Sequence, residues 1–232
     1  MSDMNYLNRF LCLGALVLTP ALFADTFAGK ISLAITDAKG KTTVMNQTMK
    51  GTATRLEAEG MPGAMIMDFS KKEMIMLMND DHMYMVMPIK DGAAHEHQTK
   101  PAAEAEIVVT GKTETILGYH CKQIMVTEGK ETTEMWVAEG LGLFAGMGAP
   151  AGGGGMFGSK KGKAESAQWE RALKGKGGFP LRVISRNAAG KETYKMEAKK
   201  IEKGGVTDAD FLPPKDFQKF EMPDMGNMNP FK

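Results

Sequence analysis

Short runs in which apolar and polar residues alternate make up most of the chain. Gly, Pro, Asn and Asp separate these runs, and that combination predicts β-strands joined by tight turns. Consecutive strands with such short connections must be antiparallel neighbours, because parallel strands need a long crossover. The runs occupy residues 26–37, 42–51, 52–60, 64–69, 73–79, 82–89, 107–116, 118–129, 132–140, 179–187 and 192–204.

The remaining segments are different in kind. Residues 90–106 are polar and alanine-rich and predict a loop, and the glycine- and methionine-rich residues 139–163 predict a flexible loop. Residues 164–178 are rich in Ala, Glu and Gln and predict the best helix of the chain. We therefore expect one mainly β (α+β) domain over residues 25–222, followed by a disordered tail at 223–232.

The most unusual runs place a methionine at every second position. If Asp80 and Asp81 form a two-residue loop, Met78 lies opposite Met83, and the same register continues along both strands. A loop centred on Ser70 and Lys71 likewise places Met67 opposite Met74 and Met65 opposite Met76. Because side chains alternate across a strand, one sheet face then carries eight methionines: Met65, Met67, Met74, Met76, Met78, Met83, Met85 and Met87.

Three interpretations of this methionine face remain open. It is packed core beneath the helix that contains Trp169, or it lines a cavity for an apolar ligand, or it holds a soft metal. A methionine row at strand spacing is more often core packing than a binding site, but methionine is flexible and also suits surfaces that adapt to varied partners. Thioethers select Cu(I), and the candidate ligands are Met76 and Met85 with His95 and His97, although alternation along strands spreads sulfurs over a sheet.

The N-terminus has the pattern of a secretory signal peptide. Arg9 precedes an apolar run that ends at Ala24, a small residue that suits cleavage before Asp25. We expect residues 1–24 to be removed on export to the periplasm, and the run is too short for a comfortable transmembrane helix. The mature chain then holds a single cysteine, Cys121, and cannot form an internal disulfide.

Composition and motifs narrow the function classes. The 232 residues are 43% hydrophobic and 25% charged, and the formal net charge of +1 gives no reason to expect nucleic-acid binding. No catalytic motif is present, and the adjacent His120 and Cys121 point to opposite faces of a strand. We expect no enzyme activity, no catalytic residues and no cofactor. The unusual count is 21 methionines against 11 phenylalanines.

Four segments together resemble a known bacterial exported family. They read "TGKTETILGYHCKQIMV", "EMWVAEGLG", "GFPLRVI" and "MEAKKIEKGGVTDADFLPP". The resemblance, to the family of domain of unknown function 4412, covers roughly residues 26–222. That family looks related to the periplasmic lipoprotein carriers (LolA-like). The resemblance implies an incomplete β-barrel that wraps one or two helices on its concave side, where such carriers hold acyl chains, and it carries over no functional residues.

These observations lead to one favoured function and two alternatives. We expect a non-catalytic periplasmic protein that binds a lipid, an acyl chain or another apolar ligand through the methionine face. The alternatives are a methionine-based periplasmic Cu(I)-binding protein and an interaction module of the cell envelope without a small ligand.

Overall fold

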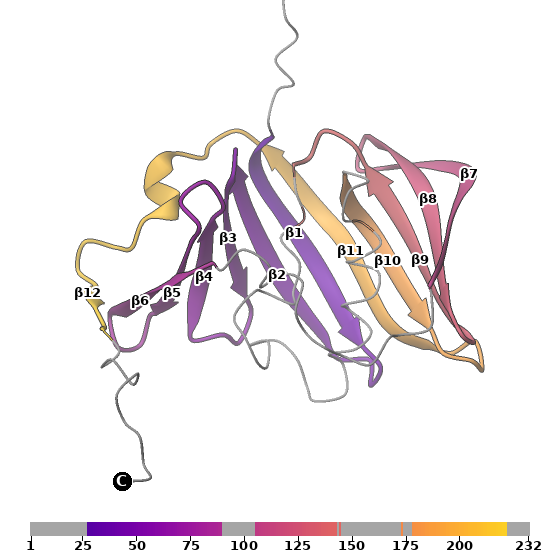
Figure 1. Cartoon of the computed structure of the whole chain (residues 1–232), viewed down its shortest axis with the longest axis horizontal. Coiled ribbons are helices and arrows are strands. Elements are labelled where there is room, and N and C mark those ends of the chain that lie inside the picture. The colour runs from indigo at the N-terminus through magenta and orange to yellow at the C-terminus, as the bar shows by residue number, and fades with distance from the viewer. Residues whose placement is uncertain (1–26, 90–104, 143, 145–172, 174–177, 222–232) are drawn as a thin grey trace, which may run out of the picture.

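Twelve strands form one curved sheet in the computed structural model of the chain (Figure 1). The structure describes residues 27–89, 105–142, 144, 173 and 178–221. The strands are β1 (Ala28–Asp37), β2 (Thr42–Lys50), β3 (Ala53–Ala58), β4 (Gly63–Asp68), β5 (Glu73–Met78), β6 (Met83–Pro88), β7 (Glu106–Ile116), β8 (Tyr119–Glu128), β9 (Glu131–Ala138), β10 (Phe179–Arg186), β11 (Glu192–Lys203) and β12 (Gln218–Lys219). A short 3-10 helix, η1 (Asp208–Phe211), precedes β12.

The sheet consists of two antiparallel meanders that meet in its middle. Strands β1–β6 run consecutively toward one edge and strands β11–β7 toward the other, with β1 paired to β11. Because β7 and β12 lie at opposite ends of the strand order, the sheet stays open. The expected open, curved, mainly β architecture is therefore confirmed. The exception to antiparallel pairing is β12, which pairs with β6 in parallel.

Several irregularities bend the sheet. The register between β1 and β11 shifts after Ser32, and that between β7 and β8 shifts between Val109 and Thr113. A further shift lies in β10 between Pro180 and Arg182. Bulges of this kind increase the local twist and bend the bulged strand, which fits the strong curvature of the sheet (Figure 1).

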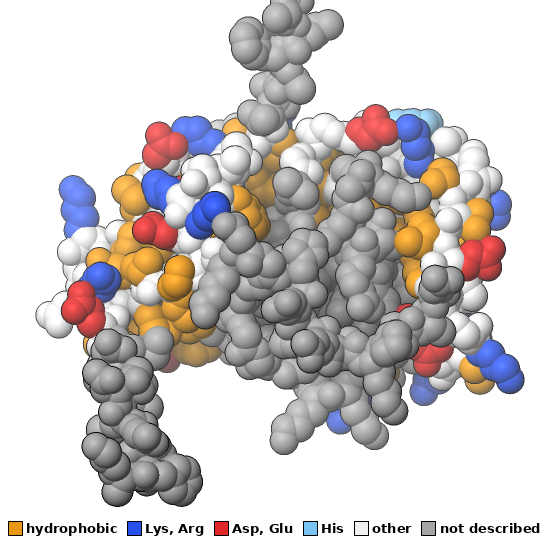
Figure 2. Space-filling model, viewed as in Figure 1, with side chains coloured by type: hydrophobic (Ala, Val, Ile, Leu, Met, Phe, Trp, Pro, Cys, Tyr) orange, Lys and Arg blue, Asp and Glu red, His pale blue; other side chains and the backbone are white. Residues whose placement is uncertain are grey.

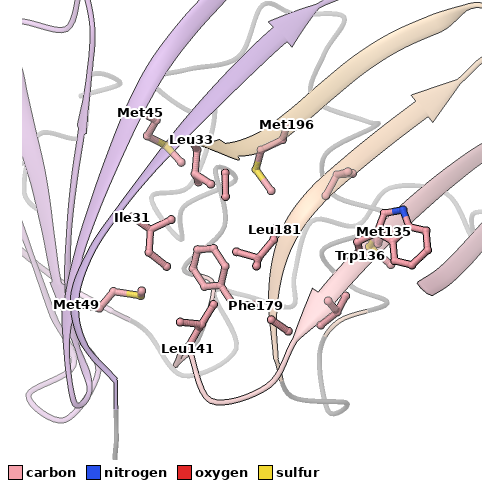
Figure 3. Close-up of a cluster of buried hydrophobic side chains, with 14 of the residues drawn as sticks. Ile31, Leu33, Met45, Met49, Met135, Trp136, Leu141, Phe179, Leu181 and Met196 are labelled. Carbon is pink, nitrogen blue, oxygen red and sulfur yellow. The ribbon is translucent and has the colours of Figure 1, made fainter. Parts of the chain in front are cut away.

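One face of the sheet, called the inner face below, carries the main hydrophobic core. Its buried side chains come from both meanders, and Figure 3 shows Ile31 and Leu33 of β1 facing Phe179 and Leu181 of β10. Phe144 also packs on this core, and its ring meets that of Phe179 edge-on at a centroid distance of 5.3 Å. Leu173, the helical residue described within the predicted helix 164–178, packs there too.

Several predictions concern residues outside the described ranges. These are the signal peptide at 1–24, most of the glycine-rich loop at 139–163, the helix around Trp169 and the tail at 223–232. Among the described residues, no helix is long and apolar enough to cross a membrane.

Candidate functional site

The eight predicted methionines lie in register on three neighbouring strands. Met74, Met76 and Met78 of β5 pair with Met87, Met85 and Met83 of β6, in that order. On the other side of β5, Met67 pairs with Met74 and Met65 with Met76. The register predicted from alternation is therefore the observed one. We call these eight side chains the methionine surface.

Of the two loops that set this register, one is longer than predicted. Asp68 pairs with Glu73, and Met78 with Met83, so each loop contains four residues, whereas two were predicted for the loop at Asp80 and Asp81. A loop of two residues and a loop of four residues with the same centre place the same residues opposite one another, so the methionine pairs are unchanged. In each loop the last residue, Lys72 or His82, adopts a positive φ of 54° or 49°.

The side chain of Asp68 fixes the first of these loops. Its Oδ1 accepts hydrogen bonds from the Ser70 backbone N–H at 3.0 Å, the Ser70 hydroxyl at 2.6 Å and the Lys71 backbone N–H at 3.2 Å. Its Oδ2 lies 3.0 Å from the Lys71 Nζ. Burial by itself raises the pKa of Asp68, but these hydrogen bonds outweigh it and lower the pKa to about 2. The carboxylate is thus ionised at every physiological pH.

The methionine surface continues directly into the main core. One row of cross-strand partners runs from Ile31 through Gln47, Leu56 and Met65 to Met76, and ends at Met85 on β6. A parallel row runs from Met49 through Thr54, Met67 and Met74 to Met87. Side chains opposite one another share a face, so the methionine surface belongs to the inner face.

Burial divides the methionine surface into two parts. Met65, Met67 and Met74 are buried, with at most 3% of each side chain exposed, and they belong to the main core. The other five, which we call the outer methionines, are half-buried: Met76, Met78, Met83, Met85 and Met87. Burial thus decreases from the middle of the sheet toward β6. Apolar side chains are visible at this end of the molecule in Figure 2.

Two polar side chains interrupt the inner face next to the buried methionines. Gln47 is fully buried, and its Nε2 donates to the Thr54 Oγ1 and the Met49 Sδ, both at 3.2 Å. A buried amide needs such partners, because an unpaired one is costly in an apolar environment. These contacts hold the Gln47 side chain of β2 against Thr54 of β3, within the row that joins β1 to the methionine surface.

The opposite face of the same hairpins, called the outer face, is covered by the chain's own C-terminal segment. Ala64, Ile66 and Leu77 form a second buried cluster with Phe211 of η1. Val206 and Phe217 pack against this cluster, and β12 continues the segment along the edge of β6. The hydrogen bonds from the Gln218 N–H to the His82 carbonyl and from the Phe220 N–H to the Tyr84 carbonyl hold it there.

More methionines share the inner face than the sequence register identified. Met45 and Met49 of β2, Met135 of β9 and Met196 of β11 are all buried in the main core. Their strands contain one or two methionines each, so no local alternation marked them. The signal that was available is strand alternation within each run, which places Met135 on the same face as Val137 and Met196 on the same face as Ala198.

Other candidate chemistry is weak in the described part of the chain. Burial raises the pKa of the Cys121 thiol, which keeps it protonated, and its Sγ donates to the Tyr119 carbonyl.

A small polar recess along β8 to β11 contains Thr133, Ser185 and Arg186. Thr133 is hydrogen-bonded to Ser185, and Arg186 forms an ion pair with Glu134. Within the described ranges, no three His, Cys, Asp or Glu side chains converge on a metal position. His95 and His97 lie outside those ranges.

Comparison with known proteins identifies a family and several similar folds. The family model described as "Domain of unknown function (DUF4412)" matches residues 27–217. No functionally curated protein matches the chain.

Three solved structures illustrate the fold similarity. An uncharacterized conserved protein from Thermus thermophilus is 10% identical, with 85% of this chain and 91% of that chain covered and a TM-score of 0.48. A putative outer membrane lipoprotein-sorting protein domain from Vibrio parahaemolyticus is 8% identical, with 80% and 88% covered and a TM-score of 0.31. A DUF1329 family protein from Desulfovibrio piger is 10% identical, with 82% and 91% covered and a TM-score of 0.32.

A lipoprotein-sorting domain is thus among the similar structures, as the sequence resemblance predicts. Identities of 8–10% and TM-scores below 0.5 carry no argument about ligand or partner.

Proposed function

The chain belongs to the family of domain of unknown function 4412, and we propose that it is an exported, non-catalytic protein that binds an apolar ligand on its methionine surface. The ligand class is an acyl chain or a similarly long apolar molecule. The surface runs from the buried Met65, Met67 and Met74 to the outer methionines, and ligand contacts concentrate on the latter.

The observation that carries this proposal is the decrease of burial along two continuous rows of cross-strand partners. A sheet face that serves only as core is expected to be buried across its width, whereas here the three β5–β6 pairs each include a half-buried methionine. On the outer face, Phe211 packs with Ile66 and Leu77, while Ile75 and Tyr84 are half-buried against this cluster. The half-buried methionines of the inner face at β5 and β6 are the area that we assign to ligand contact.

The chemistry of methionine supports an adaptable binding surface. Its unbranched side chain has three rotatable bonds and a polarisable sulfur, so a row of methionines can follow ligands of different shape. Branched side chains, which have fewer rotamers, occupy the outer face of β4 and β5 as Ile66 and Ile75. The chain thus places defined side chains where its own segment packs, and flexible ones where a ligand contacts the sheet.

Export is part of the same proposal. The apolar run that ends at Ala24 has the pattern of a signal peptide, and we place the mature protein in the periplasm. The periplasm is aqueous, so an acyl chain that crosses it must be shielded from water, and a carrier protein provides that shielding. N-terminal sequencing of the protein secreted to the periplasm is expected to begin at Asp25.

A fluorescent fatty acid tests the binding surface. We expect its emission to rise on binding to the mature protein, and binding to weaken at least tenfold in the double variant Met76→Gln with Met85→Gln. Glutamine has nearly the same length but brings a polar amide that is costly to bury without a partner. Met125→Gln is the matched control, because Met125 is a half-buried methionine on β8 that pairs with Glu134 away from the methionine surface.

Two results would oppose the proposal. If the wild-type protein does not bind the probe and contains no lipid after extraction with organic solvent, the interaction module without a small ligand becomes the better account. If Met125→Gln weakens binding as much as the double variant does, the ligand binds elsewhere.

A further inference from the structure

The outer part of the methionine surface contains a compact block of four thioethers. Met76 pairs with Met85, and Met78 with Met83, so two adjacent cross-strand pairs lie on the same face of one hairpin. All four are half-buried, in contrast to the buried Met65 and Met74 beside them. The four side chains therefore occupy neighbouring positions on one face, and each residue is partly exposed.

The spacing of this block lets its sulfurs converge. Directly opposed residues of an antiparallel pair have Cβ atoms about 5 Å apart. Residues two apart on one strand are separated by about 7 Å, twice the rise per residue. The Cβ atoms thus form a small rectangle, and each methionine sulfur lies two bonds beyond its Cβ on a freely rotating stem. Three or four sulfurs can tilt inward over the centre of such a rectangle.

The surroundings favour a cation there. Asp80 and Asp81 lie in the loop that joins Met78 to Met83, and both are exposed. Neither β5 nor β6 contains a lysine or an arginine. The imidazole of the neighbouring His82 is directed to Asp216, with 3.0 Å between Nδ1 and Oδ2. Lys219 of the neighbouring β12 is paired with Glu221 at 3.2 Å, and the two loop carboxylates add negative charge at this end of the hairpin.

From this geometry we infer that Met76, Met78, Met83 and Met85 form a binding site for one monovalent soft cation, of which Cu(I) is the biological example. Neutral thioethers are ligands that select Cu(I) over harder divalent ions such as Zn²⁺ or Mg²⁺. The inference goes beyond apolar-ligand binding, because it depends on the sulfur atoms and not on the apolar area.

Competition against a coloured Cu(I) chelator under anaerobic conditions tests the site. We expect the mature protein to withdraw one Cu(I) per chain, with a first coordination shell of sulfur in X-ray absorption spectra. In Met76→Leu with Met85→Leu, affinity is expected to fall at least tenfold, while Met125→Leu, on the other half of the sheet, retains it. Circular dichroism confirms the fold of each variant.

The outcomes separate this site from the proposed function. The two proposals have separate readouts on the wild-type protein, because the chelator reports Cu(I) withdrawal by sulfur and the fatty-acid probe reports apolar binding. No competition with the chelator, equal affinity in the double Leu variant, or a first shell that contains nitrogen would each overturn the copper site. None of these results would change the interpretation of probe binding.

Discussion

At Asp68, a single carboxylate organises the loop on which the methionine register depends. It accepts three hydrogen bonds from Ser70 and Lys71 within a four-residue loop. Such Asx-type contacts let a short side chain hold the backbone in a turn. The same contacts hold the pKa of Asp68 at about 2, below the value near 3.9 of an unfolded chain.

The depressed pKa predicts how Asp68 contributes to stability at different pH. Its contribution is present above the unfolded pKa and is lost as the pH falls through about 4 toward 2. A shift of this size corresponds to about 2 kcal/mol for a side chain that is only 18% exposed. Urea unfolding at pH 7 and pH 3 measures it. We expect the free energy of unfolding of Asp68→Asn to depend less steeply on pH than that of the wild type, and parallel curves would contradict this.

Residue identity predicted the pairing of the methionines but not their burial. Alternation alone placed Met76 and Met67 on the same face, because side-chain direction in a strand depends only on local geometry. Whether a methionine is buried depends on which segments cross that face. The decisive difference between Met67, at 0% exposed, and the half-buried Met76 therefore needed the structure.

At the scale of elements, the hairpins were predictable where turn residues bracket alternating runs. The loop at 79–82 has four residues where two were predicted, and the register is unchanged because the longer loop keeps the same centre. The C-terminal segment was less predictable. Val206, Phe211 and Phe217 cover the outer face from irregular spacings that match no helix or strand period.

The β7–β8 hairpin offers a test of turn chemistry. Ile116 pairs with Tyr119, which leaves Leu117 and Gly118 as a two-residue loop with φ values of 48° and 84°. Two positive φ angles define a turn that favours Asn-Gly and disfavours leucine. Leu117 is 47% exposed, so little packing is lost on substitution.

We expect Leu117→Asn to stabilise the protein by roughly 1 kcal/mol, because holding an ordinary side chain in the left-handed region costs roughly 1–2 kcal/mol. Leu117→Val is expected to destabilise the protein, because a β-branched residue fits this conformation worse than leucine does. Thermal unfolding of the three proteins measures the order. A valine variant as stable as the asparagine variant would show that backbone strain does not determine stability at this position.

On the scale of the whole molecule, the two faces of the sheet carry different sets of apolar side chains. The outer face of β3–β6 is covered by the C-terminal segment, and the inner face carries the main core and the methionine surface. The resemblance to the family predicted the open curved sheet. It did not predict which chain segment covers the branched residues, because that contact joins residues about 140 positions apart, such as Ile66 and Phe211.

Phe211 tests the role of the C-terminal segment. It is 8% exposed in the second cluster, and Phe211→Ala is expected to lower the free energy of unfolding by about 3 kcal/mol. Phe220→Ala is the control in the same segment, because Phe220 is 42% exposed and its loss is expected to cost under about 0.5 kcal/mol. Equal effects of the two variants in urea unfolding would contradict a packing role for Phe211.

The central claim is that an apolar ligand contacts the inner face at β5 and β6, and photolabelling tests it most directly. A fatty acid with a photoreactive group near the end of its chain is bound to the mature protein, irradiated and mapped by peptide mass spectrometry. We predict that the label lies on Met76, Met78, Met83, Met85 and Met87, which share the inner face. Label on Tyr84 and Val86 of the outer face, or label spread without preference over the sheet, would contradict the account.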